Sequence, residues 1–270
     1  MTTGYPFLDE GGPVLAFAHR GGAGHPELSG LENTLAAFAH AVDLGYRYLE
    51  TDVHVTRDGV LVAFHDALLE RVTDGAGRLV GLDAHELAEV LVGGREPVPT
   101  LASLVATYPD VRLNLDLKAG AAVAPLAAFV REHGLEDRVL VGSFSGRRLR
   151  RFRRLAGPRV ATSASPGEVA AYVALPARLA RRLTRHGPVA LQVPHRRGPL
   201  VVASARLVRR AHAVGLPVHV WTVDDPEEMA LLVDRGVDGL MTDRTDILRH
   251  VLRERGLWTE QPHPGREDAR

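Results

Sequence analysis

Carboxylate side chains recur at alternate positions in two short, mainly apolar stretches of this sequence. Glu50 and Asp52 fall in 48–55, and Asp116 falls in 112–118. Since successive side chains of a β-strand point to opposite faces, each stretch has one acidic and one apolar face. Burial of uncompensated carboxylates costs on the order of several kcal/mol per ion, so we expect a cation between them. Oxygen ligands without a thiolate suit Mg²⁺ or Ca²⁺, and ion pairs with arginine or contacts with helix N-termini are the alternative.

Two histidines close strand-like segments of the sequence. His19 lies at the end of 14–20, and His65 lies at the end of 60–66. An imidazole titrates near neutral pH, so one ring can remove a proton while the other donates one. Most of the 13 histidines must be ordinary core or surface residues, but the carboxyl ends of strands are where α/β barrels place their active sites. We therefore predict that His19 and His65 act as general acid and base, in an order that the sequence leaves open.

Two cationic side chains accompany these groups. Arg20 follows His19, and Lys118 ends the second acidic stretch. Lys118 is the only lysine among the 33 basic residues, and its compact ammonium fits a narrow space that a planar guanidinium does not. Around a metal, two such charges indicate an anionic ligand, which we predict to be a phosphate.

Three further side chains are candidates for the substrate pocket. Glu32 and Asn33 stand where the helical periodicity of 32–44 begins. Capping that helix and holding the metal or phosphate are equally good interpretations of the motif Glu32-Asn33-Thr34. Trp221 lies late in the strand-like stretch 217–223, where it either walls the pocket or packs in the core.

The elements that must position these residues alternate between strand-like and helix-like patterns. Short runs of β-branched and large apolar residues predict nine strands, over 14–20, 48–56, 60–66, 112–118, 138–144, 160–165, 190–194, 217–223 and 239–243. Helical periodicity predicts eight helices, over 32–44, 101–108, 121–133, 147–155, 167–186, 200–214, 226–235 and 245–255. Seven or eight such units predict a parallel sheet with helical crossovers, and no GxGxxG turn follows a strand. We therefore predict an α/β fold, a closed (β/α)₈ TIM barrel.

One unit departs from this alternation. Asp58-Gly59 separates two strand-like runs and is typical of a hairpin. The loop-rich segment 67–99 that follows is predicted to be an insertion that caps one barrel end. The chain then divides into an N-terminal extension (1–13), the barrel (14–256) and a loose, polar C-terminal tail (257–270).

The composition excludes several classes of protein. The absence of cysteine from the 270 residues rules out disulfides, thiolate metal sites and cysteine nucleophiles. A hydrophobic content of 45% excludes global disorder, and the balance of 33 basic and 33 acidic residues gives no overall field for nucleic acid. The N-terminus lacks a secretory pattern and no long apolar run occurs, so we expect a soluble cytoplasmic protein.

Basic residues are concentrated in one part of the chain. Segment 147–210 holds 16 arginines and a single acidic residue, Glu168, and six of the arginines crowd the predicted helix between Arg147 and Arg154. A solvated basic face is the simpler interpretation. Peripheral contact with an anionic membrane, at about 1 kcal/mol per basic residue, is the alternative. Phe152 is the only aromatic residue in that run, so we expect no nucleic-acid partner.

Taken in order, the motifs around these residues resemble the glycerophosphodiester phosphodiesterase family. They are His19-Arg20-Gly21, Glu32-Asn33-Thr34, Glu50-Thr51-Asp52-Val53, Thr56-Arg57-Asp58-Gly59, His65-Asp66, Pro99-Thr100-Leu101, Asn114-Leu115-Asp116-Leu117-Lys118, Trp221-Thr222-Val223-Asp224 and the run from Gly236 to Asp243. The resemblance covers about 14–252 and implies a (β/α)₈ barrel with an insertion after the second strand.

The resemblance also implies a reaction, the metal-dependent hydrolysis of small glycerophosphodiesters to glycerol 3-phosphate and an alcohol. It assigns roles to seven residues: the ligands of one divalent cation are Glu50, Asp52 and Asp116, the general acid and base are His19 and His65, and the phosphate is held by Arg20 and Lys118. Many members carry Glu where this chain has Asp116, whose oxygens are set back by a methylene. Two alternatives are a lysophospholipase D-like or phospholipase D-like enzyme acting on lipids at a membrane, and a non-catalytic barrel that binds a phosphorylated ligand.

Overall fold

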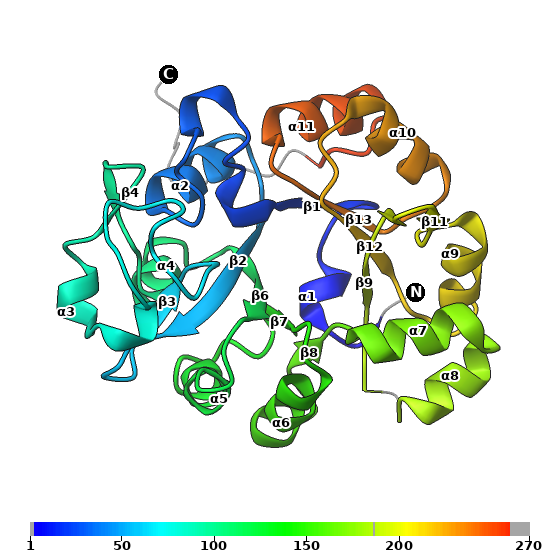
Figure 1. The fold of residues 1–270 in the computed structure, drawn as a ribbon. Coiled ribbons are helices and arrows are strands. Elements are labelled where there is room, and N and C mark those ends of the chain that lie inside the picture. Colours follow the sequence, from blue (N-terminus) through cyan, green and yellow to red (C-terminus); the bar gives the residue numbers. More distant parts are fainter. Residues whose placement is uncertain (1–2, 186, 260–270) are drawn as a thin grey trace.

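Eight parallel strands form a ring that is surrounded by helices (Figure 1). The structure is a computed structural model and describes residues 3–185 and 187–259. In order around the ring, the strands are β8 (Ala161–Thr162), β7 (Val139–Gly142), β6 (Arg112–Leu117), β2 (Tyr48–Val55), β1 (Leu15–Ala18), β13 (Gly239–Thr242), β12 (Val218–Trp221) and β9 (Leu191–Pro194). Two 2.9 Å backbone hydrogen bonds, from Ala164 N to Ala190 O and from Val189 N to Thr162 O, close the ring where the chain leaves β8 and approaches β9. The predicted TIM barrel is therefore confirmed.

The helices pack their apolar faces against the outside of this ring. They are α2 (Leu35–Asp43), α4 (Leu101–Thr107), α5 (Val123–Glu132), α6 (Gly146–Ala156), α7 (Pro166–Ala174), α8 (Ala177–Leu183), α9 (Ala205–His212), α10 (Pro226–Asp234) and α11 (Thr245–Glu254). The single helix predicted over 167–186 is wrong, because Leu175 is extended and separates α7 from α8. Leu175 precedes Pro176, and the residue before a proline is disfavoured in the helical region.

The helix predicted over 200–214 begins too early. Its first residues instead form β11 (Leu200–Val201), which pairs with β10 (Arg196–Arg197) in a small antiparallel hairpin. Helix α9 begins only after Ser204, whose side chain accepts a hydrogen bond from the backbone N–H of Leu207. A serine in this position satisfies one of the unpaired N–H groups of the first turn.

The register of β2 and β6 places Asp52 and Asp116 at one level of the barrel, and Glu50 lies two residues before Asp52 on the same face. Glu50 pairs with Asn114, and Asp52 pairs with Asp116. The alternate residues of β2, such as Leu49, pack outward in the main core beneath the helices. The predicted division of these strands into an inward polar row and an outward apolar row is therefore confirmed.

The N-terminal segment closes the end of the barrel where the parallel strands begin. Helix α1 (Pro6–Asp9) lies across the ring in Figure 1. Its Phe7 is fully buried, and the ring centroid of Phe7 lies 5.2 Å from that of Tyr48 and 6.5 Å from that of Phe17. The Tyr48 hydroxyl donates a 2.8 Å hydrogen bond to Phe7 O. Residues 3–13 thus add a buried contact to the interior of the barrel through Phe7.

The predicted hairpin and the segment that follows it lie beside β2. Strand β3 (Leu61–Ala63) pairs antiparallel with β2, as the Asp58-Gly59 turn indicates. The insertion then contains η3 (Leu79–Gly81), α3 (Ala84–Leu87), β4 (Leu91–Val92) and β5 (Glu96–Pro97). A small apolar cluster of its own, which includes Phe64, Leu69 and Leu87, holds it together.

The arginines of α6 do not form one uniform face. Arg153 forms an ion pair with Glu168, and Arg148 donates hydrogen bonds to the carbonyl oxygens of Leu117 and Lys118. Within the described chain, no helix is both long enough and apolar enough to cross a bilayer. In the predicted C-terminal tail, Trp258 packs against Tyr46 with ring centroids 5.1 Å apart, and residues 260–270 lie outside the described residues.

Candidate active site

A cavity of about 930 Å³ opens at the carboxyl ends of the barrel strands. Seven residues predicted to carry chemistry line it, namely His19, Arg20, Glu50, Asp52, His65, Asp116 and Lys118. They come from four separate parts of the chain: the turn η1 (His19–Gly21) after β1, the strand β2, the end of β3, and β6. The structure therefore brings all seven together, as the sequence predicts.

His19 is held between two carboxylates. Its Nδ1 lies 2.8 Å from Oδ1 of Asp243, and its Nε2 lies 3.8 Å from Oε2 of Glu50. Burial lowers the pKa of His19, but the charges of Glu50 and Asp243 outweigh burial and raise this pKa to about 9. The ring is therefore oriented by Asp243 on one side and faces the cavity carboxylates on the other.

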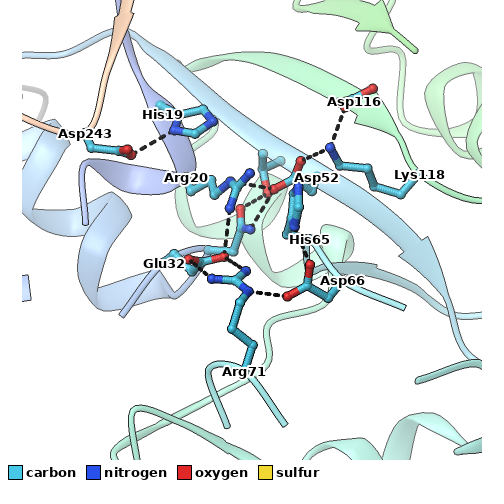
Figure 2. A network of polar contacts seen from close by, with 12 residues as sticks. His19, Arg20, Glu32, Asp52, His65, Asp66, Arg71, Asp116, Lys118 and Asp243 are labelled. Carbon is cyan, nitrogen blue, oxygen red and sulfur yellow. Dashed lines mark hydrogen bonds and ion pairs between the residues drawn. The ribbon is translucent and has the colours of Figure 1, made fainter. Parts of the chain in front are cut away.

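His65 is held in a similar way by the residue that follows it. His65 Nδ1 lies 2.6 Å from Oδ1 of Asp66, and Asp66 accepts a hydrogen bond from Arg71. Arg71 also forms a forked contact with Glu32, with N–O distances of 2.6 and 2.9 Å. Glu32 in turn accepts a 3.0 Å hydrogen bond from Arg20 Nη1. Figure 2 shows this chain of charges, in which Arg71 connects the partner of His65 to the partner of Arg20.

Asp52 is at the centre of the site. Its side chain is 1% exposed and contacts three donors. Lys118 Nζ lies 2.9 Å from Oδ1, and Arg20 Nε and Asn33 Nδ2 lie 3.1 and 3.0 Å from Oδ2. Burial raises the pKa of Asp52, but Lys118 and Arg20 outweigh burial and lower it. The two cations thus contact the acidic residues themselves, so the alternative prediction of ion pairs with arginine is partly realised (Figure 2).

The carboxylates fit a divalent cation in their chemistry. Burial, together with the charges of Asp52 and Asp116, raises the pKa of Glu50 to about 7. A nearby positive charge, such as that of a cation, would stabilise the ionised form of Glu50. Asp116 Oδ2 accepts from Lys118 at 2.7 Å, whereas its buried Oδ1 has no hydrogen-bond partner in the described part of the chain. However, Glu50, Asp52 and Asp116 do not each offer an oxygen within 4.8 Å of the other two in the described part of the chain. A cation would therefore draw these oxygens closer together.

Glu32 and Asn33 lie before α2, the helix predicted to begin at 32, and of the motif Glu32-Asn33-Thr34 only Thr34 caps it. Helix α2 begins at Leu35, and Thr34 caps it by accepting a hydrogen bond from Ala37 N. Asn33 has a left-handed backbone (φ 61°), and its side chain donates to Asp52 while it accepts a 2.7 Å hydrogen bond from the Thr51 hydroxyl. The side chain of Asn33 is thereby fixed on Asp52.

The rest of the cavity wall is largely apolar. Trp221, the third predicted pocket residue, lies on it in an edge-to-face contact with Phe144, at a centroid distance of 5.5 Å. Phe144, Leu200 and Val173 also line the cavity, although they are 62%, 56% and 39% exposed. The cavity therefore has a charged cluster, and elsewhere its wall presents apolar side chains to solvent beside Arg196 and Arg197.

Three residues of the site, Asp66, Arg71 and Asp243, have no role that the sequence predicts. Asp66 and Asp243 stand in the motifs, and their places shortly after β3 and directly after β13 are the signal that would have found them. Arg71 lies in the insertion, where no periodicity or spacing indicates that it reaches Glu32.

Comparison with known proteins places this chain in a family. The model of the glycerophosphoryl diester phosphodiesterase family matches residues 19–247. A probable glycerophosphodiester phosphodiesterase 2 of Mycobacterium tuberculosis is 40% identical over 255 residues, which cover 93% of this chain and 95% of the relative. A glycerophosphodiester phosphodiesterase of Caldanaerobacter subterraneus is 28% identical, with 90% and 99% covered. The crystal structure of a putative glycerophosphoryl diester phosphodiesterase from Silicibacter pomeroyi gives a TM-score of 0.77 at 27% identity and covers 94% of this chain and 100% of its own. The chain therefore belongs to the glycerophosphoryl diester phosphodiesterase family and is a phosphoric diester hydrolase.

Proposed function

We propose that this enzyme hydrolyses glycerophosphodiesters to glycerol 3-phosphate and an alcohol, with His19 and His65 as general acid and base. One observation carries the proposal: two histidines, each oriented by its own aspartate, face a single cavity together with three carboxylates, Arg20 and Lys118. A non-catalytic barrel has no need of two oriented imidazoles beside a phosphate-sized cluster of charge.

In this mechanism the histidines move the protons. One imidazole removes a proton from the nucleophile, which is water or the glycerol 2-hydroxyl, and the other protonates the leaving alcohol. Asp243 and Asp66 accept from Nδ1 of the two rings, which leaves Nε2 of each ring for the substrate. The aspartates thus fix the tautomer and the direction of each ring.

Arg20 and Lys118 bind the phosphate oxygens in the proposal. Asp52 and Asp116 account for two of the three ammonium donors of Lys118, and the third remains for a phosphate oxygen. A divalent cation, Mg²⁺ or Ca²⁺, held by Glu50, Asp52 and Asp116 would neutralise charge on the phosphate when bound. The unpartnered Oδ1 of Asp116 and the raised pKa of Glu50 support this ligand set.

The direct test is hydrolysis of glycerophosphocholine, measured as release of glycerol 3-phosphate with Mg²⁺, with Ca²⁺ and with chelator. His19→Ala and His65→Ala are each expected to lower kcat by roughly 10²–10⁴-fold, whereas His250→Ala on the exposed face of α11 should leave it unchanged. Near-normal turnover in both site variants would reject the acid–base assignment. Full activity in chelator would reject the cation.

The apolar wall favours a second candidate, a substrate whose leaving alcohol carries a hydrocarbon chain. A cavity of about 930 Å³ is near the upper end of the roughly 300–1,000 Å³ typical of ligand pockets. The exposed Phe144, Leu200 and Val173 would cover apolar surface of such a substrate. Leu200→Asp should then lower kcat/KM for lysophosphatidylcholine and leave glycerophosphocholine unaffected, whereas an equal effect on both substrates would remove this candidate.

A further inference from the structure

A cluster of possible metal ligands lies outside the cavity. His25 and Glu27 are in the loop that follows η1, and His40 is on α2. One ligand atom of each residue lies within 4.8 Å of the others, and this is the one such group of three or more in the part of the chain that the structure describes. The ring centroids of the two histidines are 4.4 Å apart.

The fold holds this loop against α2. Leu28 and Leu31 of the loop pack on Ala37 in a small buried cluster, and His40 follows Ala37 by three residues, on the same side of the helix. His25 caps the short helix η2 (Pro26–Leu28), where its Nδ1 accepts a 3.3 Å hydrogen bond from Glu27 N. That bond is long, so it competes weakly for the lone pair of the ring. The loop ribbon beside α2 is visible in Figure 1.

The chemistry of the cluster suits a transition metal. The buried Nδ1 of His40 has no hydrogen-bond partner among the described residues, so its bonding capacity is unused. Burial and the neighbouring His25 lower the pKa of His40, which favours the neutral imidazole that a metal requires. Two imidazoles and one carboxylate select Zn²⁺ over Mg²⁺ or Ca²⁺, which prefer oxygen ligands. Asp43 and Asp246 add negative charge near His40.

We propose that His25, Glu27 and His40 form a Zn²⁺-binding site that is separate from the catalytic carboxylates and cross-links the first loop of the barrel to α2. The same loop reaches the active site, because Gly24 N donates a 2.9 Å hydrogen bond to the backbone carbonyl of Asp243, the residue that orients His19. Zinc at this site therefore stabilises the loop next to the catalytic residues. The proposal does not depend on which phosphodiester the enzyme hydrolyses.

The test is zinc binding to the full chain in excess Mg²⁺, which occupies the oxygen-rich site. Wild-type protein is expected to bind one Zn²⁺ by calorimetry, to raise its thermal midpoint with Zn²⁺, and to give a visible Co²⁺ absorption spectrum. His25→Gln/His40→Gln should weaken Zn²⁺ binding by more than the roughly 10–100-fold typical of losing a group that only supports a ligand. His250→Gln, a change of an exposed histidine on α11, is the matched control and should bind as wild type.

Three further arms make the result decisive. Circular dichroism of the metal-free proteins checks folding, and His25→Gln alone, in the loop, serves if the double variant does not fold. Glu50→Gln should keep the zinc site. Equal zinc affinity in wild type and the histidine variants overturns the proposal, as does loss of zinc binding in Glu50→Gln alone.

Discussion

At the scale of single residues, the aspartates behind the two histidines make the clearest prediction. Asp243→Asn and Asp66→Asn keep the size of the side chain but remove the charge that holds Nδ1–H of His19 or His65. Each change is expected to lower kcat for glycerophosphocholine by about 10- to 10³-fold, since it disturbs an acid–base group worth roughly 10²–10⁴-fold. Steady-state kinetics measure this, with Asp110→Asn on the surface as the control. Unchanged kcat in both variants would show that the pairs do not orient the rings.

Arg71 is expected to position two residues without reaching the phosphate itself. Removal of its guanidinium frees Glu32 and Asp66 together, so Arg71→Ala should raise KM through Arg20 and lower kcat through His65. Arg71→Lys should restore activity only in part, because an ammonium cannot make the forked contact with Glu32. Arg95→Ala, an exposed residue of the same insertion, is the control. An Arg71→Ala enzyme with wild-type KM and kcat contradicts this role.

The residues that the sequence could identify are those placed by local alternation. Glu50, Asp52 and Asp116 share a face because strands alternate, and the parallel register of β2 and β6 then pairs Asp52 with Asp116. Arg71 is different, because its contact with Glu32 spans 39 residues and depends on how the insertion folds back. No pattern within a window of the sequence encodes such a contact.

At the scale of elements, the N-terminus of α7 depends on Glu168. This residue completes a capping box with Ser165 and forms a forked ion pair with Arg153 of α6. Glu168→Ala removes the cap and leaves a half-buried guanidinium without its partner, so we expect a loss of about 2–4 kcal/mol in the free energy of unfolding. Urea denaturation measures this, with the exposed Glu132→Ala of α5 as the control. A loss no larger than that of the control would mean that the pair contributes nothing.

The same pair makes stability depend on pH. Burial raises the pKa of Glu168, but the hydrogen bonds from Arg153 and Ser165 outweigh it, and the folded pKa lies below the ordinary value of 4.5. Ionised Glu168 therefore stabilises the protein above about pH 4.5, and this contribution is lost as the pH falls through the folded pKa. The difference in unfolding free energy between wild type and Glu168→Ala should shrink from pH 7 toward pH 3. A difference that stays constant with pH would show that ionisation of Glu168 does not contribute to stability.

Elements with a clear hydrophobic periodicity could be predicted from the sequence, and very short elements could not. All nine predicted strands overlap observed ones, because each combines β-branched residues with clear boundaries. The hairpin of β10 and β11 has two residues in each strand, which is too short for any period to register. Pro176 marks the break between α7 and α8, although helical periodicity continues on both sides of it.

At the scale of the whole molecule, the two ends of the barrel should respond differently to the loss of an aromatic ring. Phe7→Ala opens a cavity in the interior cluster with Phe17 and Tyr48, and is expected to cost about 3–5 kcal/mol without a change in KM. Phe144→Ala at the exposed mouth should cost little stability and change KM instead. Thermal unfolding and steady-state kinetics of the two variants test this together. A stability loss of similar size in both variants would contradict the division.

The site contains a single lysine amine that a reagent can modify. Lys118 is the only lysine in the 270 residues, and its side chain is 18% exposed inside the cavity. Burial lowers the pKa of Lys118, but Asp52 and Asp116 outweigh burial and raise it, so the amine stays protonated and reacts slowly. Because Lys118 is the only lysine, prolonged acylation labels one lysine side chain, which mass spectrometry separates from the labelled α-amine, and the extent of labelling reports whether the cavity is occupied. A compound that covers this amine protects it from the reagent, so its binding is detected without a turnover assay.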